Sequence, residues 1–133
     1  MQGSRPTIRV VSAEIQRDGC YLITQRLASA VLPLLWEFPG GRVRAGESDL
    51  EALVRAVHHR VGAHVVPEAK VLEVHHDYPD YTVALCVYRC SIVSGEPAPR
   101  SVHDLAWVEP DAFSSYEFPG ADYKTVELLL QDG

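Results

Sequence analysis

The most regular pattern of apolar and polar positions lies between residues 48 and 61. Its apolar residues recur at intervals of three and four positions and comprise Leu50, Leu53, Val54, Val57 and Val61. This spacing aligns their side chains along one face of a helix. Gly62 follows, and a glycine at this place is typical of the left-handed residue that ends a helix. The pattern therefore predicts a helix over residues 48–61 with one buried face.

Runs rich in β-branched residues predict strands on both sides of this helix. They cover residues 8–15, 20–24, 71–76, 83–93 and 105–108. A turn at residues 17–19 joins the first two strands into a hairpin. Pro33 interrupts the apolar run at residues 27–35, which favours a loop, and a second helix is expected over residues 123–131. Because no repeat or linker is present, residues 1–133 are expected to form a single mixed α/β domain.

The composition limits the kind of partner. With 133 residues, 47% of them hydrophobic, the chain is long enough to build a core without disulfides or metals. The net charge of −6 argues against a nucleic-acid polymer, but it permits a nucleotide, which needs only a local basic pocket. No apolar run reaches the length of a membrane span, and the three cysteines are expected to be reduced. We therefore expect a cytoplasmic protein, with monomer and homodimer both open.

The segment between Gly41 and Gly62 has a distinctive spacing. Glu47 follows Gly41 after five residues, and Arg55 follows Glu47 after seven. This spacing resembles the Nudix box, G-x5-E-x7-R-E-U-x-E-E-x-G-U, in which U is a bulky aliphatic residue. Three positions that are glutamate in the box hold other residues here, namely Ala56, His59 and Arg60.

The resemblance covers nearly the whole chain. Residues 22–26 look like the second strand of the MutT-type branch, which includes oxidised-guanine and cytidine triphosphate pyrophosphatases. Residues 36–41, Trp-Glu-Phe-Pro-Gly-Gly, are similar to the segment that leads into the box of these enzymes, and residues 116–122 resemble the segment that opens their last helix. The resemblance implies the Nudix fold, a mixed β-sheet sandwiched between helices in an α/β/α arrangement.

The resemblance also implies roles for individual residues. Asp122 would face the nucleobase and Arg26 the phosphates. The candidate substrate-binding residues are Arg26, Glu37, Phe38, Arg42, Arg60 and Asp122. Gly120 stands where these relatives usually carry proline, and it is expected to loosen that turn.

In the Nudix family the box glutamates hold Mg²⁺ or Mn²⁺, which bridge diphosphate oxygens and activate a water. Here Glu47 and Arg55 are the candidate catalytic residues, and His59 is a further candidate. Glu47 and Gly41 are the candidate metal ligands. The surviving pair has a second interpretation, because Glu47 and Arg55 could simply bind each other.

The substituted positions weaken the case for a metal. Ala56 offers no oxygen ligand, and the nitrogen of His59 suits Zn²⁺ or Mn²⁺ better than Mg²⁺. Arg60 places a positive charge where the metal should lie, but its guanidinium could replace the charge of the metal on a diphosphate. A further acidic residue, which related enzymes carry ahead of a strand tryptophan, falls here at Ser101.

Three hypotheses follow. In the first, the chain is a MutT-like Nudix-fold protein that binds a nucleotide or a nucleoside-diphosphate-linked ligand, needs no metal, and has impaired or lost metal-dependent hydrolysis. In the second, it is an active nucleoside triphosphate pyrophosphohydrolase that uses Mg²⁺ or Mn²⁺, with help from an acid such as Glu73 or Asp104. In the third, it is a protein-interaction module without enzymatic activity.

Overall fold

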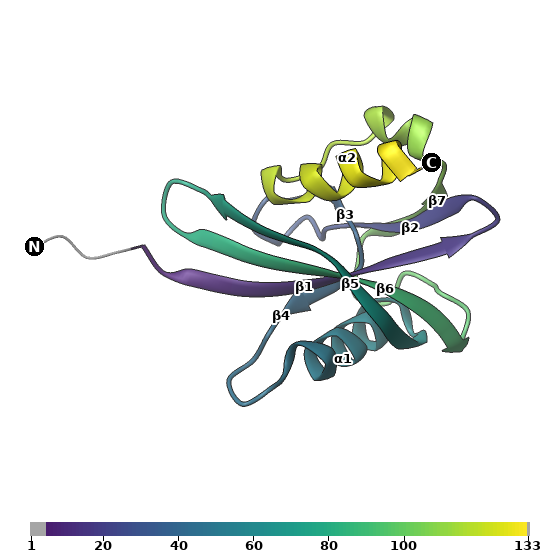
Figure 1. Cartoon of the computed structure of the whole chain (residues 1–133), viewed down its shortest axis with the longest axis horizontal. Helices are drawn as coiled ribbons and strands as arrows, with labels where there is room; N and C mark the ends of the chain where they lie inside the picture. The colour runs from purple at the N-terminus through teal and green to yellow at the C-terminus, as the bar shows by residue number, and fades with distance from the viewer. Residues whose placement is uncertain (1–4, 133) are drawn as a thin grey trace, which may run out of the picture.

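The computed structural model describes residues 5–132, and its strands form one twisted mixed sheet (Figure 1). The strands are β1 (Thr7–Arg17), β2 (Cys20–Gln25), β3 (Trp36–Glu37), β4 (Gly40–Arg42), β5 (His64–Asp77), β6 (Thr82–Ser94) and β7 (Asp104–Val108). The helical elements are α1 (Asp49–Val61), α2 (Tyr123–Asp132) and the 3₁₀ turns η1 (Pro110–Ser115) and η2 (Gly120–Asp122).

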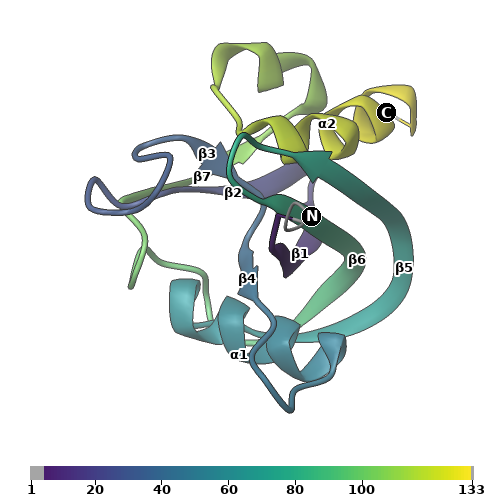
Figure 2. The same ribbon diagram turned by 90° about the vertical axis from the view of Figure 1, so that its left-hand side faces the viewer.

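Strand β1 is central to this sheet. It runs parallel to β6 from the pair Thr7/Thr82 to the pair Ile15/Cys90, and it pairs antiparallel with both β4 and β2. The main strand order is β3-β2-β1-β6-β5, with β7 added to β2. Helices α1 and α2 lie on opposite sides of the sheet (Figures 1 and 2). The predicted mixed sheet between helices is therefore confirmed.

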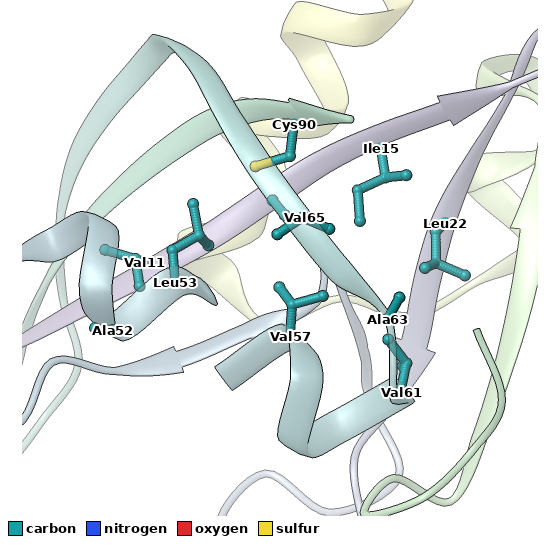
Figure 3. Close-up of a cluster of buried hydrophobic side chains, with 11 residues drawn as sticks. Val11, Ile15, Leu22, Ala52, Leu53, Val57, Val61, Ala63, Val65 and Cys90 are labelled. Carbon is teal, nitrogen blue, oxygen red and sulfur yellow. The ribbon is translucent and has the colours of Figure 1, made fainter. Parts of the chain in front are cut away.

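Helix α1 begins and ends as the sequence predicts. Ser48 and Glu51 form a reciprocal capping box at its start, and Gly62 ends it with a φ of +79°. Figure 3 shows Leu53, Val57 and Val61 of the helix directed toward the sheet. Their neighbours in this cluster are Val11, Ala13, Ile15, Leu22, Ala52, Ala63, Val65 and Cys90.

The buried face of α1 differs from the prediction in one respect. Leu50, assigned to the apolar stripe, is 48% exposed, whereas Ala56 is only 2% exposed. The face is rotated because β4 packs against the helix through small residues, as described below. Ala56, which was not assigned to the apolar stripe, is therefore a packing residue.

Strand β5 is longer than the six residues predicted for it. It starts at His64, and its pairing with β6 is interrupted by register shifts at three places, between residues 64 and 65, 67 and 69, and 70 and 72. Each irregularity breaks the alternation of apolar and polar positions that marks a strand in a sequence. Pro67 is tolerated because β5 lies at the edge of the sheet.

A second core lies under α2. The rings of Phe38 and Phe118 stack with centroids 5.6 Å apart, and Phe113 meets both rings edge-on. Phe38 is 1% exposed. This aromatic cluster anchors the segment of residues 36–41 between the two helices, and so fixes the position of its neighbour Glu37.

Candidate functional site

The double glycine brings β4 into close contact with its neighbours. A Cβ atom on Gly40 would lie 2.7 Å from the Cα of Ser12 and even closer to the carbonyl of Val11, so only glycine fits there. A Cβ atom on Gly41 would lie 3.1 Å from the Cβ of Ala56 and 3.6 Å from Nη2 of Arg60. The two glycines therefore place the backbone of β4 between β1 and α1, beside the guanidinium of Arg60.

A cavity of about 320 Å³ lies between the sheet, the connections that follow β2 and β5, and the 3₁₀ turn η2. Its size is at the lower end of the range typical of small-molecule sites. Its charged lining residues are Arg26, Glu37, Arg42, Arg60 and Asp122. Its apolar wall includes Ile8, Val10, Val83 and Leu85 from β1 and β6, and Gly41 also lines it. The cavity thus contains five of the six predicted substrate-binding residues.

Glu37 links two arginines across this cavity. Its Oε1 accepts a hydrogen bond from Nη1 of Arg26 at 3.0 Å, and its Oε2 lies 3.5 Å from Nη1 of Arg60. Arg26 is held independently, because its Nε donates to the carbonyl of Val31 at 2.7 Å. One carboxylate is therefore shared by two guanidiniums that come from different elements.

Asp122 is the buried acid of the cavity. It is 8% exposed and lies in η2, just before α2. Burial raises the pKa of its carboxyl well above the ordinary value, and the nearby charge of Glu37 raises it further. Arg26 and a hydrogen bond with the Phe38 backbone act in the opposite direction on this pKa. The pKa is raised on balance, so the carboxyl keeps its proton to higher pH than an exposed aspartic acid, and in that form it can both donate and accept a hydrogen bond.

Two tyrosines that the sequence analysis missed complete the cavity. Tyr78 and Tyr81, in the connection between β5 and β6, stack with ring centroids 5.0 Å apart, and both line the cavity. The Tyr78 hydroxyl accepts a hydrogen bond from the backbone N–H of Ala121 at 3.1 Å. The only available signal was the Tyr-Pro-Asp turn, which predicts a bend but not what the rings contact.

Gly120 is a packing position. A Cβ atom there would lie 2.7 Å from Cε1 of His76, whose ring meets Tyr78 edge-on at 4.7 Å. The expectation that Gly120 loosens the turn stays a prediction. Its lack of a side chain leaves room for His76, and η2 closes with a 3.0 Å hydrogen bond from the Asp122 N–H to the Pro119 carbonyl.

Phe38 requires a correction. It was predicted to bind substrate, but its side chain is buried in the aromatic cluster under α2 and does not line the cavity. Its contribution to the cavity is the hydrogen bond between its backbone and Asp122. The cavity therefore uses the main chain of this residue rather than its ring.

Glu47 and Arg55 lie outside the cavity and bind each other. Arg55 donates from Nε to Oε2 of Glu47 at 2.6 Å and from Nη2 to Oε1 at 2.9 Å, and the N–H of Arg44 also donates to Oε1 at 2.8 Å. The hydrogen bonds from Arg55 and from the Arg44 backbone lower the pKa of Glu47 to about 2. Arg55 also donates to the Arg42 carbonyl at 2.9 Å, which ties the pair to the end of β4.

The remaining box positions are used for packing and capping. His59 is exposed at the end of α1, and its carbonyl accepts a 2.6 Å hydrogen bond from the Ser101 hydroxyl. The backbone N–H of Ser101 donates to the carbonyl of Arg60 at 3.1 Å. Ser101, where the resemblance predicts an acid, thus satisfies carbonyls in the last turn of the helix.

The donor atoms present do not fit a Mg²⁺ or Mn²⁺ centre. Within residues 5–132 no three His, Cys, Asp or Glu side chains gather where they could hold a metal ion. Glu47 is engaged by Arg55, and Gly41 offers only a carbonyl. The two acids suggested as substitutes are elsewhere, since Glu73 pairs with Lys70, and Asp104 accepts a hydrogen bond from the Leu105 N–H. Neither lines the cavity.

A wider hollow of about 540 Å³ lies at the other end of β1. It is lined by charged residues that already form ion pairs, such as Arg89 with Glu14 at 3.6 Å and Arg17 with Glu96 at 2.8 Å. It contains none of the predicted site residues. The cavity around Glu37 is therefore the better candidate.

None of the helices in the described part of the chain is long and apolar enough to cross a membrane.

Comparison with known proteins agrees with this architecture. The 8-oxo-dGTP diphosphatase of Haemophilus influenzae is 32% identical over 127 residues, which cover 94% of this chain and 93% of that protein. The CTP pyrophosphohydrolase of Escherichia coli is 29% identical over 123 residues, which cover 92% of this chain and 91% of that protein.

Solved structures support the same relationship. The solution structure of the E. coli ORF135 protein superposes with a TM-score of 0.81 and 28% identity, covering 98% of this chain and 94% of that one. The crystal structure of a MutT protein from Methanosarcina mazei has the same fold, with a TM-score of 0.87, 22% identity and 98% of both chains covered. The family model described as "NUDIX domain" matches residues 10–128. Since this match spans most of the sequence, the chain belongs to the NUDIX domain family.

Proposed function

We propose that this protein binds a nucleoside triphosphate or a nucleoside-diphosphate-linked ligand in the cavity around Glu37. The observation that carries the proposal is the arrangement of charge along one cavity, with a buried acid, Asp122, connected through Arg26 and Glu37 to Arg60. A nucleotide has the matching polarity, with a hydrogen-bonding base at one end and phosphates at the other.

The base end of the cavity combines an apolar wall with a polar group. The stacked rings of Tyr78 and Tyr81 and the aliphatic residues of β1 and β6 offer surface to the faces of a base. A protonated Asp122 offers a donor and an acceptor to its edge. The phosphate end has Arg26, Arg42 and Arg60, whose planar guanidiniums match phosphate oxygens.

The relatives support a nucleoside triphosphate as the first ligand class to test. Their names specify 8-oxo-dGTP and CTP, which share a triphosphate and differ in the base. We infer that metal-dependent hydrolysis of the family type is impaired or lost, which the lack of a fitting donor set among residues 5–132 supports. Binding is accordingly the primary function in this proposal.

The proposal is tested by calorimetric titration of dGTP, 8-oxo-dGTP, CTP and UDP-glucose, each with EDTA and with Mg²⁺. At least one of them should bind, and Asp122→Ala should weaken that binding by about tenfold or more, since it removes a buried hydrogen-bonding group. Asp111→Ala is the matched control, because Asp111 is an exposed acid in η1. Failure of all four ligands under both conditions would refute the proposal.

A second candidate is an active nucleoside triphosphate pyrophosphohydrolase. It is favoured by the similarity to the H. influenzae diphosphatase over nearly the full length of both proteins, and by the presence of Gly41, Glu47 and Arg55 at their box positions. Pyrophosphate release from the same triphosphates with Mg²⁺ or Mn²⁺ tests it. Turnover that falls by orders of magnitude in Glu47→Gln would establish this candidate, and equal rates in both proteins would exclude a mechanism centred on Glu47.

A further inference from the structure

We infer that Arg26 and Arg60 bind a phosphate group of the ligand directly, without a divalent metal, at the position that the Glu37 carboxylate holds between them. Glu37 is then an internal anion that the phosphate displaces. This inference rests on the proposed function, because it assigns the chemistry of the phosphate end of the same cavity.

The two arginines converge on one anion. Arg26 follows β2, whereas Arg60 lies in the last turn of α1, and both point an Nη1 atom at Glu37. The carboxylate presents one oxygen to each guanidinium, an arrangement that two oxygens of a phosphate group can reproduce. Only 16% of the Glu37 side chain is exposed, against 22% for Arg26 and 28% for Arg60. Two like charges in such a sheltered place require an anion between them.

Glu37 can leave without releasing Arg26, and its contact with Arg60 is weak. Arg26 keeps its 2.7 Å hydrogen bond to the Val31 carbonyl, and its backbone N–H donates to the Leu35 carbonyl at 2.8 Å. Arg60 belongs to a helix turn whose carbonyl is bound by the Ser101 N–H. Its contact with Glu37 is long, at 3.5 Å, and therefore weak. The guanidinium of Arg26 is thus held by a contact that does not involve Glu37, and the helix fixes the backbone from which the Arg60 side chain extends.

A phosphate is the stronger partner for this pair. A terminal phosphate carries more negative charge than a carboxylate and has more acceptor oxygens. Arg60 occupies a position at which the family box has a metal-binding glutamate, and no ring of acids surrounds it among residues 5–132. The cationic side chain therefore supplies positive charge where the family uses an ion.

The experiment compares a triphosphate with its own nucleoside in EDTA, so that the difference reports on the phosphates alone. We use dGTP against deoxyguanosine and CTP against cytidine, and retain the pair whose triphosphate binds. In the unaltered protein the triphosphate should bind at least about tenfold more tightly than the nucleoside, from charge-assisted hydrogen bonds. Arg60→Ala should remove most of this difference and leave nucleoside affinity unchanged. Glu37→Gln should increase it several-fold, because the competing anion is gone.

Two further variants separate local binding from charge and folding. Arg17→Ala removes the same charge at the far end of β1, where Arg17 forms an exposed ion pair with Glu96, and it should leave the difference unchanged. Arg60→Lys keeps the charge but loses the fork of donors, so it should give an intermediate value even if Arg60→Ala folds poorly.

The outcomes are distinguishable. Triphosphate binding that needs Mg²⁺ would overturn this inference and leave the proposed function standing. Loss of binding in Glu37→Gln would also overturn it, because Glu37 would then position the arginines instead of competing with the ligand. No binding of either triphosphate with or without Mg²⁺ would refute both this inference and a nucleoside triphosphate as the ligand.

Discussion

Two clusters of arginine and glutamate lie close to α1, and they differ in how completely their charges are satisfied. In the Glu47–Arg55 pair one guanidinium meets one carboxylate through two hydrogen bonds, and backbone groups complete the contacts of both. In the cavity cluster one carboxylate, Glu37, serves two guanidiniums and faces open space. The charges of the Glu47–Arg55 pair, which matches the family box, are hydrogen-bonded to each other and to the backbone, and we call this pair closed. The cavity cluster contains Arg60, which departs from the box, and its guanidiniums have donors to spare, so we call it open.

This contrast teaches that matching a motif does not by itself assign a residue to the ligand. Glu47 and Arg55 connect the loop before α1 to the helix and to the Arg42 carbonyl, so their geometry alone accounts for their presence. The cavity cluster has spare hydrogen-bonding capacity, which a ligand can use. Four predictions test this difference between the clusters, from the largest expected effect to the smallest.

The largest effect is expected at Gly40, which supports both clusters by letting β4 cross close to β1. Gly40→Ala should destabilise the protein by about 3 kcal/mol, since the new methyl group overlaps backbone atoms that cannot move aside. Gly41→Ala, whose Cβ would lie 3.1 Å from that of Ala56, should cost about 1 kcal/mol. Urea denaturation of both variants measures the difference, and equal losses would show that the close crossing is not the cause.

The next effect concerns the open cluster. Arg60→Glu should weaken triphosphate binding in EDTA by about 100-fold, because it removes a phosphate donor and adds a negative charge beside Glu37. Arg55→Gln changes the closed pair and should leave the same affinity within about twofold, since Arg55 does not line the cavity. Calorimetry decides the point. Comparable losses in both variants would remove the distinction between the clusters.

Asp122 gives a smaller effect, on stability. Its folded pKa is raised, so it binds a proton more tightly in the folded state, and its contribution to stability falls as pH rises from the unfolded value toward the folded one. Asp122→Asn should therefore be more stable than the unaltered protein at neutral pH, by about 1 kcal/mol, and this advantage should vanish below the unfolded pKa, near pH 3.8. Thermal unfolding across this pH range measures it. An advantage independent of pH would point to packing instead of ionisation.

The smallest effect belongs to the closed pair. The pKa of Glu47 is lowered from 4.5 to about 2, so its contribution to stability is present above pH 4.5 and is lost as pH falls toward 2. Because the group is solvent-screened, the loss should be slight. Glu47→Gln should flatten the pH dependence of the unfolding temperature in this window and lower that temperature slightly near neutrality, where the ion pair contributes. An unchanged acid profile would show that the pair contributes nothing measurable to folding.

The parts of the fold that follow from local chemistry were predictable. Helix α1 was specified by its periodicity and by Gly62, and the β1–β2 hairpin by its Asp-Gly turn, where Asp18 and Gly19 both have positive φ. Arg26 and Asp122 were predicted to bind the ligand from the resemblance, and Arg60 from the chemistry of its guanidinium; all three line one cavity.

The remaining features depend on contacts between distant segments. Ala56 was left out of the buried stripe because periodicity cannot register the approach of Gly41. Phe38 was assigned to the ligand because its motif gives no sign that Phe113 and Phe118 enclose it. Tyr78 and Ala121 are 43 positions apart in the sequence, and the residue pattern around either one does not predict the hydrogen bond between them.

The contact between His76 and Gly120 makes the order of amino-acid replacements matter. Because the imidazole fills the space beside position 120, a larger residue there is obstructed while His76 is present. Trimming His76 first opens that space, so the same change at position 120 would then meet less resistance. The two positions are therefore coupled, and their effects on stability should not add. A lineage leading to or from this sequence could exchange the pair easily in one order and only with difficulty in the other.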